Sequence, residues 1–191
     1  MQIVLVGAGK VASSLGVALK TAGCDIVQIF SRTEHSAVCL AQNLGASYTT
    51  NIKSLKRADI YFVCLTDDSL SSLASIIVEG REDSLFIHTA GGVNLDVFPS
   101  GRKGVMWPLQ TFSKEKLVDF THVPLFIEAS NIDDLNLLQK LASDISDRIY
   151  VLDSEKRKYV HMSAVFCNNF SNHCFAIAES LLNDCNVPFD V

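Results

Sequence analysis

Short apolar runs alternate with stretches of helical periodicity between residues 2 and 152. Runs such as residues 60–65 are apolar throughout, which is typical of strands buried on both faces of a parallel sheet. Strands separated by helices indicate βαβ units with right-handed crossovers. The pattern predicts an α/β fold, a doubly wound and mostly parallel Rossmann sheet. The predicted strands span residues 2–6, 25–30, 59–65, 85–88, 104–107, 124–127 and 148–152, and the predicted helices span 10–22, 34–44, 69–79 and 131–146.

The pattern changes after Ser154. Residues 155–183 form one long helical stretch without proline or glycine, which Asp153 or Ser154 can cap. A stripe at helical spacing predicts a packed face, and we expect further helices to cover it, from a partner subunit or from missing sequence. We predict a dinucleotide-binding domain at 1–153 and, at 154–191, the first long helix of an all-helical C-terminal domain that is truncated here. The stripe consists of Ser163, Cys167, Phe170, Cys174, Ile177 and Leu181.

A glycine-rich turn follows the first predicted strand. Gly7 permits a tight turn, Gly9 lets the backbone approach a pyrophosphate, and the small Ala12 lets helix and strand pack closely. The helix that follows would direct its free N–H groups at the phosphates. A purely structural glycine turn is the alternative. The cofactor-binding residues predicted in this segment are Gly7, Ala8, Gly9, Lys10, Val11 and Ala12.

The turn after the second predicted strand indicates which dinucleotide binds. An acidic residue at this position holds the ribose 2′-hydroxyl of NAD, whereas this chain has Ser31, Arg32 and Thr33. A guanidinium between two hydroxyls suits the 2′-phosphate of NADP. Glu34 opens the next predicted helix, where acids are favoured. We therefore expect NADPH to be preferred over NADH, with a solvated surface arginine as the alternative.

Two further strand ends lie at the same edge of the predicted sheet. Leu65, Thr66 and Asp67 follow the third long strand and are expected beside the cofactor, although this turn also suits a helix N-terminus. His88 and Thr89 precede two glycines that suggest close backbone approach at the nicotinamide end. His88 is a candidate to exchange protons near neutral pH, and a hydrogen-bonded structural histidine is the alternative.

Neutral polar side chains mark a candidate substrate site. Gln110 and Thr111 follow Trp107 and Pro108 at the end of a strand. On the long helix, His161, Asn168 and Asn172 share a face, with Asn169 one step round it, and they either line a cleft or tie helices together. His161 is a second candidate for proton transfer. The run 156–158, Lys-Arg-Lys, is expected to be a solvated face. A lysine that faces the cleft is a minor alternative, because cations are unfavourable in the first turn of a helix.

Composition excludes several classes of function. A net charge of -5 argues against general affinity for nucleic acid or anionic membranes, and no apolar run has the length of a transmembrane helix. Met1 lies directly before the first strand, so we expect no signal peptide and a cytoplasmic protein. The 6 cysteines form no CxxC pair and are expected to be reduced. His35 and Cys39 have helical i, i+4 spacing but no second ligand pair, so we predict no metal.

Several motifs together resemble an uncharacterised family of bacterial NADP oxidoreductases, which join a Rossmann domain to a helical C-terminal domain of unknown function. The resemblance covers essentially the whole chain and is carried by GAGKVASSLG, IFSRT, DIYFVCLTDDSL, IHTAGG, WPLQTFS and KYVHMSAVFCNNFSNH. More distantly, the chain is similar to pyrroline-5-carboxylate reductase and coenzyme-F420-dependent NADP reductase. The resemblance implies the pyrophosphate, 2′-phosphate and nicotinamide contacts expected above, and a homodimer built through the helical domain. Relatives often have histidine or tyrosine where this chain has Trp107.

These observations predict an oxidoreductase that transfers hydride between NADP(H) and a small carbonyl or imine substrate, with His88 or His161 moving the proton. A dinucleotide-binding sensor or scaffold without chemistry is the alternative, because no Tyr-x-x-x-Lys or clear Lys-x-x-x-Asn pair is present. A methyltransferase is a weaker alternative. Sites for S-adenosylmethionine usually keep an acidic residue after the second strand, and this chain has none in that turn. The candidate substrate residues are Gln110, Thr111, Asn168 and Asn169.

Overall fold

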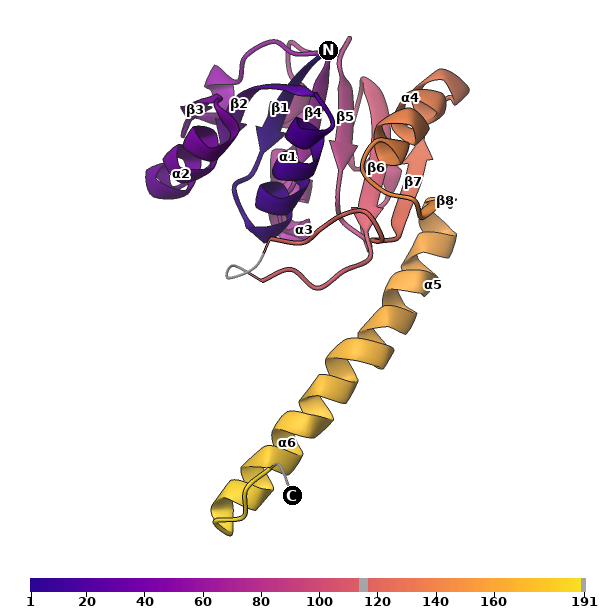
Figure 1. Cartoon of the computed structure of the whole chain (residues 1–191). Coiled ribbons are helices and arrows are strands. Elements are labelled where there is room, and N and C mark those ends of the chain that lie inside the picture. Colours follow the sequence, from indigo (N-terminus) through magenta and orange to yellow (C-terminus); the bar gives the residue numbers. More distant parts are fainter. Residues whose placement is uncertain (114–116, 190–191) are drawn as a thin grey trace.

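The computed structural model describes residues 1–113 and 117–189 (Figure 1). Within these residues, eight strands form one sheet in the order β3-β2-β1-β4-β5-β6-β7-β8. Neighbouring strands are parallel except for β6 and β7, which pair antiparallel. This is the predicted doubly wound, mostly parallel sheet. The strands are β1 (Gln2–Val6), β2 (Asp25–Phe30), β3 (Ser47–Thr49), β4 (Ile60–Val63), β5 (Leu85–His88), β6 (Arg102–Pro108), β7 (Leu125–Ala129) and β8 (Ile149–Val151).

Helices cover both faces of the sheet (Figure 1). Alternate residues of β1 point to opposite sides: Ile3 and Leu5 pack with α1, α2 and α4, whereas Val4 and Val6 pack with α3. Because both faces are covered, the central strands are apolar at nearly every position, as in other parallel sheets. The helices over the sheet are α1 (Lys10–Thr21), α2 (Glu34–Leu44), α3 (Asp67–Val78) and α4 (Ile132–Ser143), and short 3₁₀ turns lie at Ile52–Ser54 and Leu95–Val97.

Besides shifts of one to three residues at the ends of other elements, three differences from the sequence prediction have a clear cause. The short edge strand β3 was not predicted, because it has only three residues and none of them is buried. Strand β4 is shorter than the predicted 59–65, because Cys64 and Leu65 already belong to the turn that leads into α3. The predicted helix at 69–79 begins earlier, at Asp67, where two acidic side chains suit the positive end of the helix dipole.

A long helix leaves the sheet after β8 (Figure 1). It consists of α5 (Ser154–Ala164), a π-helical segment (Val165–Phe170) and α6 (Ser171–Asp184). Asp153 caps it, accepting a hydrogen bond of 2.8 Å from the Lys156 N–H, as predicted. The predicted core stripe, however, is exposed in this chain, with Phe170 at 53% and Leu181 at 63%. The helix extends away from the sheet, so the sheet and the helices that cover it do not pack against its distal half.

Candidate functional site

The glycine turn after β1 lies where three strands end. The Gly7 N–H donates to the carbonyl of Phe30 at 2.8 Å, and a Cβ at Gly7 would stand 2.4 Å from the carbonyl oxygen of Cys64. Gly7 also has a φ of +122°, a conformation that side chains disfavour. The position therefore requires glycine. At Gly9, by contrast, a Cβ would meet nothing within 4 Å, which leaves open space above the backbone.

A cavity of about 270 Å³ opens beside this turn. The turn itself forms one wall, and the residues that follow β2 and β4 form the others. Gly9 caps α1 without a side-chain hydrogen bond, so the first N–H groups of the helix remain available to a phosphate. Ala12 is fully buried beneath the turn. The lining gathers half of the predicted cofactor residues: Gly7, Ala8, Gly9, Ser31, Arg32, Leu65 and Thr66, together with Phe30, Ser36, Cys64, Ser69 and Leu73.

Hydroxyl groups organise the turn after β2. The Thr33 hydroxyl donates to the Ser36 hydroxyl at 2.9 Å, and the Thr33 N–H donates to Ser31 Oγ at 3.4 Å. Glu34 begins α2 and accepts a hydrogen bond of 3.2 Å from the hydroxyl of Tyr48. The Glu34 carboxylate is thereby bonded to Tyr48 of β3, and Arg32 lines the cavity.

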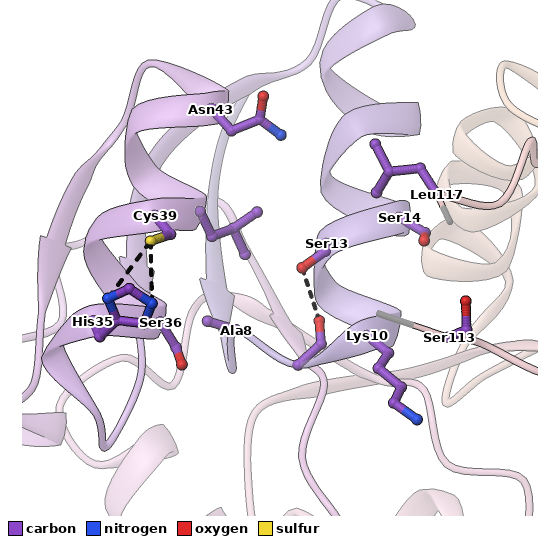
Figure 2. A pocket seen from close by; sticks show the side chains of 12 residues that line it. Ala8, Lys10, Ser13, Ser14, His35, Ser36, Cys39, Asn43, Ser113 and Leu117 are labelled. Atoms are coloured by element: carbon purple, nitrogen blue, oxygen red, sulfur yellow. Dashed lines mark hydrogen bonds between the residues drawn. The ribbon is translucent and has the colours of Figure 1, made fainter. Parts of the chain in front are cut away.

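A second cavity, of about 480 Å³, lies between α1 and α2 (Figure 2). It includes Lys10 and shares Ala8, Gly9 and Ser36 with the first cavity. His35 and Cys39 line it and contact one another, with both ring nitrogens 3.8–3.9 Å from Cys39 Sγ (Figure 2). Across the described ranges, no group of three His, Cys, Asp or Glu side chains is placed to hold a metal ion.

A third cavity, of about 530 Å³, lies between the end of β6 and the long helix. All four predicted substrate residues line it. The Asn168 amide donates to the Thr111 hydroxyl at 3.1 Å and to Asn169 Oδ1 at 3.2 Å, while Gln110 Oε1 accepts from the Thr111 N–H at 2.8 Å. Asn168 and Asn169 belong to the π-helical segment, and such segments frequently occur at functional sites. The spatial grouping agrees with a polar cleft beneath the helix.

His161 stands above the glycine pair that follows β5. Its ring packs edge-on against Trp107, with the ring centres 5.4 Å apart. A Cβ at Gly91 would lie 2.6 Å from the Trp107 ring and 2.9 Å from His161 Nδ1, so only glycine fits here. Across Gly92, a Cβ would be 3.7 Å from both His161 and the Asp67 carboxylate. The imidazole thus lies at the carboxyl edge of the sheet, on the lining of the third cavity.

Two family descriptions match the sequence: "NADP oxidoreductase coenzyme F420-dependent" at residues 2–92 and "Domain of unknown function (DUF2520)" at residues 123–191. A crystal structure of a putative NADP oxidoreductase from Bacteroides fragilis has 47% sequence identity to this chain. The match covers 99% of this chain and 74% of that one, with a TM-score of 0.91. The chain belongs to the NADP oxidoreductase family.

More distant structures share the fold of this NADP oxidoreductase. A Thermotoga maritima protein is 22% identical over 93% of this chain and 68% of its own, with a TM-score of 0.78. A pyrroline-5-carboxylate reductase from Coxiella burnetii is 16% identical over 96% and 70%, with a TM-score of 0.68. A search of curated proteins finds no match. The predicted family and enzyme class, an oxidoreductase with a nicotinamide dinucleotide cofactor, are confirmed.

His88 of the oxidoreductase lies in the core rather than in a cavity. Its side chain is fully buried, with its ring 6.0 Å from that of Phe98. Nδ1 accepts a hydrogen bond of 3.3 Å from the Ala90 N–H, and Nε2 has no partner among the described residues. Burial, followed by the charge of Arg157, lowers the pKa of His88 to about 3. A neutral, enclosed imidazole is poorly placed for the proton exchange that the sequence suggested.

Arg157 is the residue that the sequence analysis missed. It was expected on a solvated face, but it is 1% exposed. Its guanidinium forms an ion pair with Glu128 of β7 and donates to the Val93 carbonyl at 2.6 Å. The sequence holds no local sign of this burial, because both partners lie far away along the chain.

Among the described residues, no helix combines the length and the apolar composition that crossing a membrane requires.

Replacing His88 by phenylalanine should make the oxidoreductase less sensitive to acid. The folded pKa is about 3, below the ~6.5 of an unfolded histidine. The unfolded state therefore binds more protons between these values, and stability is lost as the pH falls below ~6.5. At about pH 5 the loss from this one group is about 2 kcal/mol. Urea unfolding at neutral and acidic pH measures this loss of unfolding free energy. His35→Phe, which replaces an exposed histidine, is the control. An equal acid loss in wild type and His88→Phe would contradict this assignment.

Proposed function

We propose that this oxidoreductase transfers hydride between NADP(H) and a small carbonyl or imine compound held in the cavity beneath the long helix. The observation that carries the proposal is the position of His161. It lies above the Gly91–Gly92 turn at the carboxyl edge of the sheet, where ligands of doubly wound folds bind, and it lines the polar cavity. A group able to exchange protons thus borders both the expected nicotinamide end and the space for a substrate.

The residues present fit a bound dinucleotide. Gly7 and Gly9 keep the backbone accessible beside a cavity, and the N-terminus of α1 carries free N–H groups toward it. The arginine and hydroxyls after β2 supply donors suited to a 2′-phosphate, which supports NADPH as the preferred form. When bound, the nicotinamide ring supplies or accepts the hydride.

The chain's own side chains divide the remaining work. The amides of Gln110, Asn168 and Asn169 and the hydroxyl of Thr111 orient a neutral polar substrate beside Trp107. During reduction, His161 gives a proton to the oxygen or nitrogen that receives negative charge, and during oxidation it takes that proton back. Trp107 is only 7% exposed and walls this end of the cavity, which helps to exclude water.

The exposed helix supports a homodimer. Side chains of the π segment and α6 form an apolar surface that includes Phe166 at 59%, Phe175 at 61% and Leu181 at 63% exposure. Monomeric proteins rarely leave an apolar face of this kind in water. We propose that a second copy covers it, which would bring the partner's helix beside the substrate cavity at Asn168 and Asn169.

Arg32→Ala should remove the preference for NADPH. Losing a charged donor to the 2′-phosphate should weaken NADPH binding roughly tenfold to a hundredfold while leaving NADH binding nearly unchanged. Fluorescence titrations with both dinucleotides measure this. Arg57→Ala removes an exposed arginine that lines a different cavity beside Gln2 and serves as the control. Equal affinity of the wild type for NADPH and NADH would overturn the proposed preference.

His161→Gln should lower kcat by about 10² to 10⁴ without changing NADPH affinity, because the side chain acts in proton transfer rather than in cofactor binding. The assay follows NADPH absorbance with a panel of small aldehydes, ketones and cyclic imines. His173→Gln, an exposed histidine on the same helix, is the matched control. The proposal fails if wild-type protein binds NADPH but oxidises none of it with any compound of the panel.

Phe175→Glu should convert the proposed homodimer to a monomer, since a carboxylate cannot be buried cheaply against an apolar face. Sedimentation velocity measures the mass. Ile132→Glu is the control: it introduces the same charge at an apolar residue that is 65% exposed and lies on α4, away from the long helix. A wild-type monomer at all concentrations would rule out the homodimer.

A further inference from the structure

Arg157 connects three separate parts of the fold. One terminal nitrogen of the guanidinium is paired with Glu128 on β7. The other terminal nitrogen donates to the Val93 carbonyl at 2.6 Å and to Ser154 Oγ at 3.1 Å. Glu128 belongs to the sheet, Val93 follows the glycine pair after β5, and Ser154 begins the long helix. A single side chain that is 1% exposed therefore joins sheet, turn and helix.

The acceptors around Arg157 are fixed themselves. The Glu128 carboxylate accepts hydrogen bonds from the Ser154 N–H at 3.0 Å and from its hydroxyl at 2.8 Å. The Ser154 hydroxyl in turn accepts from the Leu95 N–H at 3.0 Å. We call these three residues, Glu128, Ser154 and Arg157, the clamp. Its hydrogen bonds define the orientation of the first helical turn relative to the sheet.

Stability alone does not account for the clamp. A cation in the first turn of a helix opposes the helix dipole. A buried ion pair is also often no more stabilising than apolar residues of the same volume, whereas it does specify one geometry. The guanidinium is suited to this purpose, because its planar fork can satisfy a carboxylate and a carbonyl at once.

The geometry specified here is that of His161. Arg157 and His161 are four residues apart, so they lie on the same face of α5, one turn from each other. Their contacts on the other side also belong to a single turn of chain, since Arg157 binds the carbonyl of Val93 and His161 lies against Gly91 and Gly92. The clamp thus acts within one helical turn of the place where the imidazole meets the glycine pair.

We propose that Arg157 is a positioning residue that holds His161 above the Gly91–Gly92 turn and against Trp107. This inference rests on the proposed function for its chemical meaning, because it is His161 that would move the proton. Arg157 itself is enclosed by protein and lines none of the three cavities described above. Removing it should leave the glycine turn at β1 and its dinucleotide contacts intact, but should let His161 leave its place.

The single tryptophan of the chain makes the position of His161 measurable without any substrate. A protonated imidazole in contact with an indole ring quenches its fluorescence. The charged groups near this contact are Asp67, across Gly92, and Arg157 itself. In the wild type we expect Trp107 fluorescence to fall on acidification, and we expect His161→Gln to abolish the fall.

In Arg157→Met, most of this pH-dependent quenching should be lost, while NADPH affinity stays unchanged. Lys158→Met, a neighbouring cation whose side chain is 44% exposed, is the matched control and should behave as wild type. The double variant Arg157→Met/Glu128→Gln removes both charges of the ion pair, so it replaces Arg157→Met in this measurement if the single variant does not fold. Arg157→Lys keeps the charge but cannot reach both acceptors, and it should recover only part of the quenching.

Full quenching in a folded Arg157→Met or double variant would overturn the proposal, as would the absence of quenching in the wild type. Failure of all three Arg157 variants to fold would overturn it too, because the clamp would then be purely structural. None of these readouts requires NADPH oxidation. A chain that binds NADPH and quenches as expected, but turns over no substrate, would refute the proposed function and leave the positioning of His161 established.

Discussion

The cavity beside the glycine turn depends on the convergence of β1, β2 and β4 at Gly7. The Gly7 N–H is bonded to the carbonyl of Phe30, the Cys64 N–H to the carbonyl of Val6, each at 2.8 Å, and no side chain fits at Gly7 between them. Because the strands are held at this spacing, the loops that follow them must open toward the same side. Arg32 and Thr66 therefore border one cavity although they are distant in sequence.

Most of the fold could be predicted because a doubly wound sheet marks its strands clearly. A strand buried on both faces must be apolar at every position, and its neighbours along the chain must be helices. The failures come from features without such a constraint. None of the three residues of β3 is buried, and the exposed stripe on the long helix has the periodicity of a packed helix without a surface in the described part of the chain to pack against. Periodicity reports that a face is apolar, but not what covers it.

The candidate site was predictable as far as local signals reach. Glycine spacing and strand ends locate the residues around the cavity at the glycine turn, and helical spacing groups Asn168 with His161. Burial of a polar side chain depends on distant partners, so the sequence could not reveal Arg157, two of whose acceptors are 29 and 64 residues away. The same limit applies to His88, for which the sequence left a hydrogen-bonded structural role open as the alternative. A strand end predicts the edge of the sheet at which a residue lies, but not whether its side chain faces a cavity or the core.

The clamp also decides how movement of the long helix is distributed. At a rise of about 1.5 Å per residue, His161 lies ~6 Å along the axis from Arg157, whereas the end of α6 lies ~40 Å away. A tilt of about 5° around the clamp would displace the far end by ~3.5 Å but the imidazole by only ~0.5 Å. The helix is thus a lever with its pivot one helical turn from His161. Large displacements of its distal end can accommodate a neighbouring molecule while the imidazole stays nearly in place.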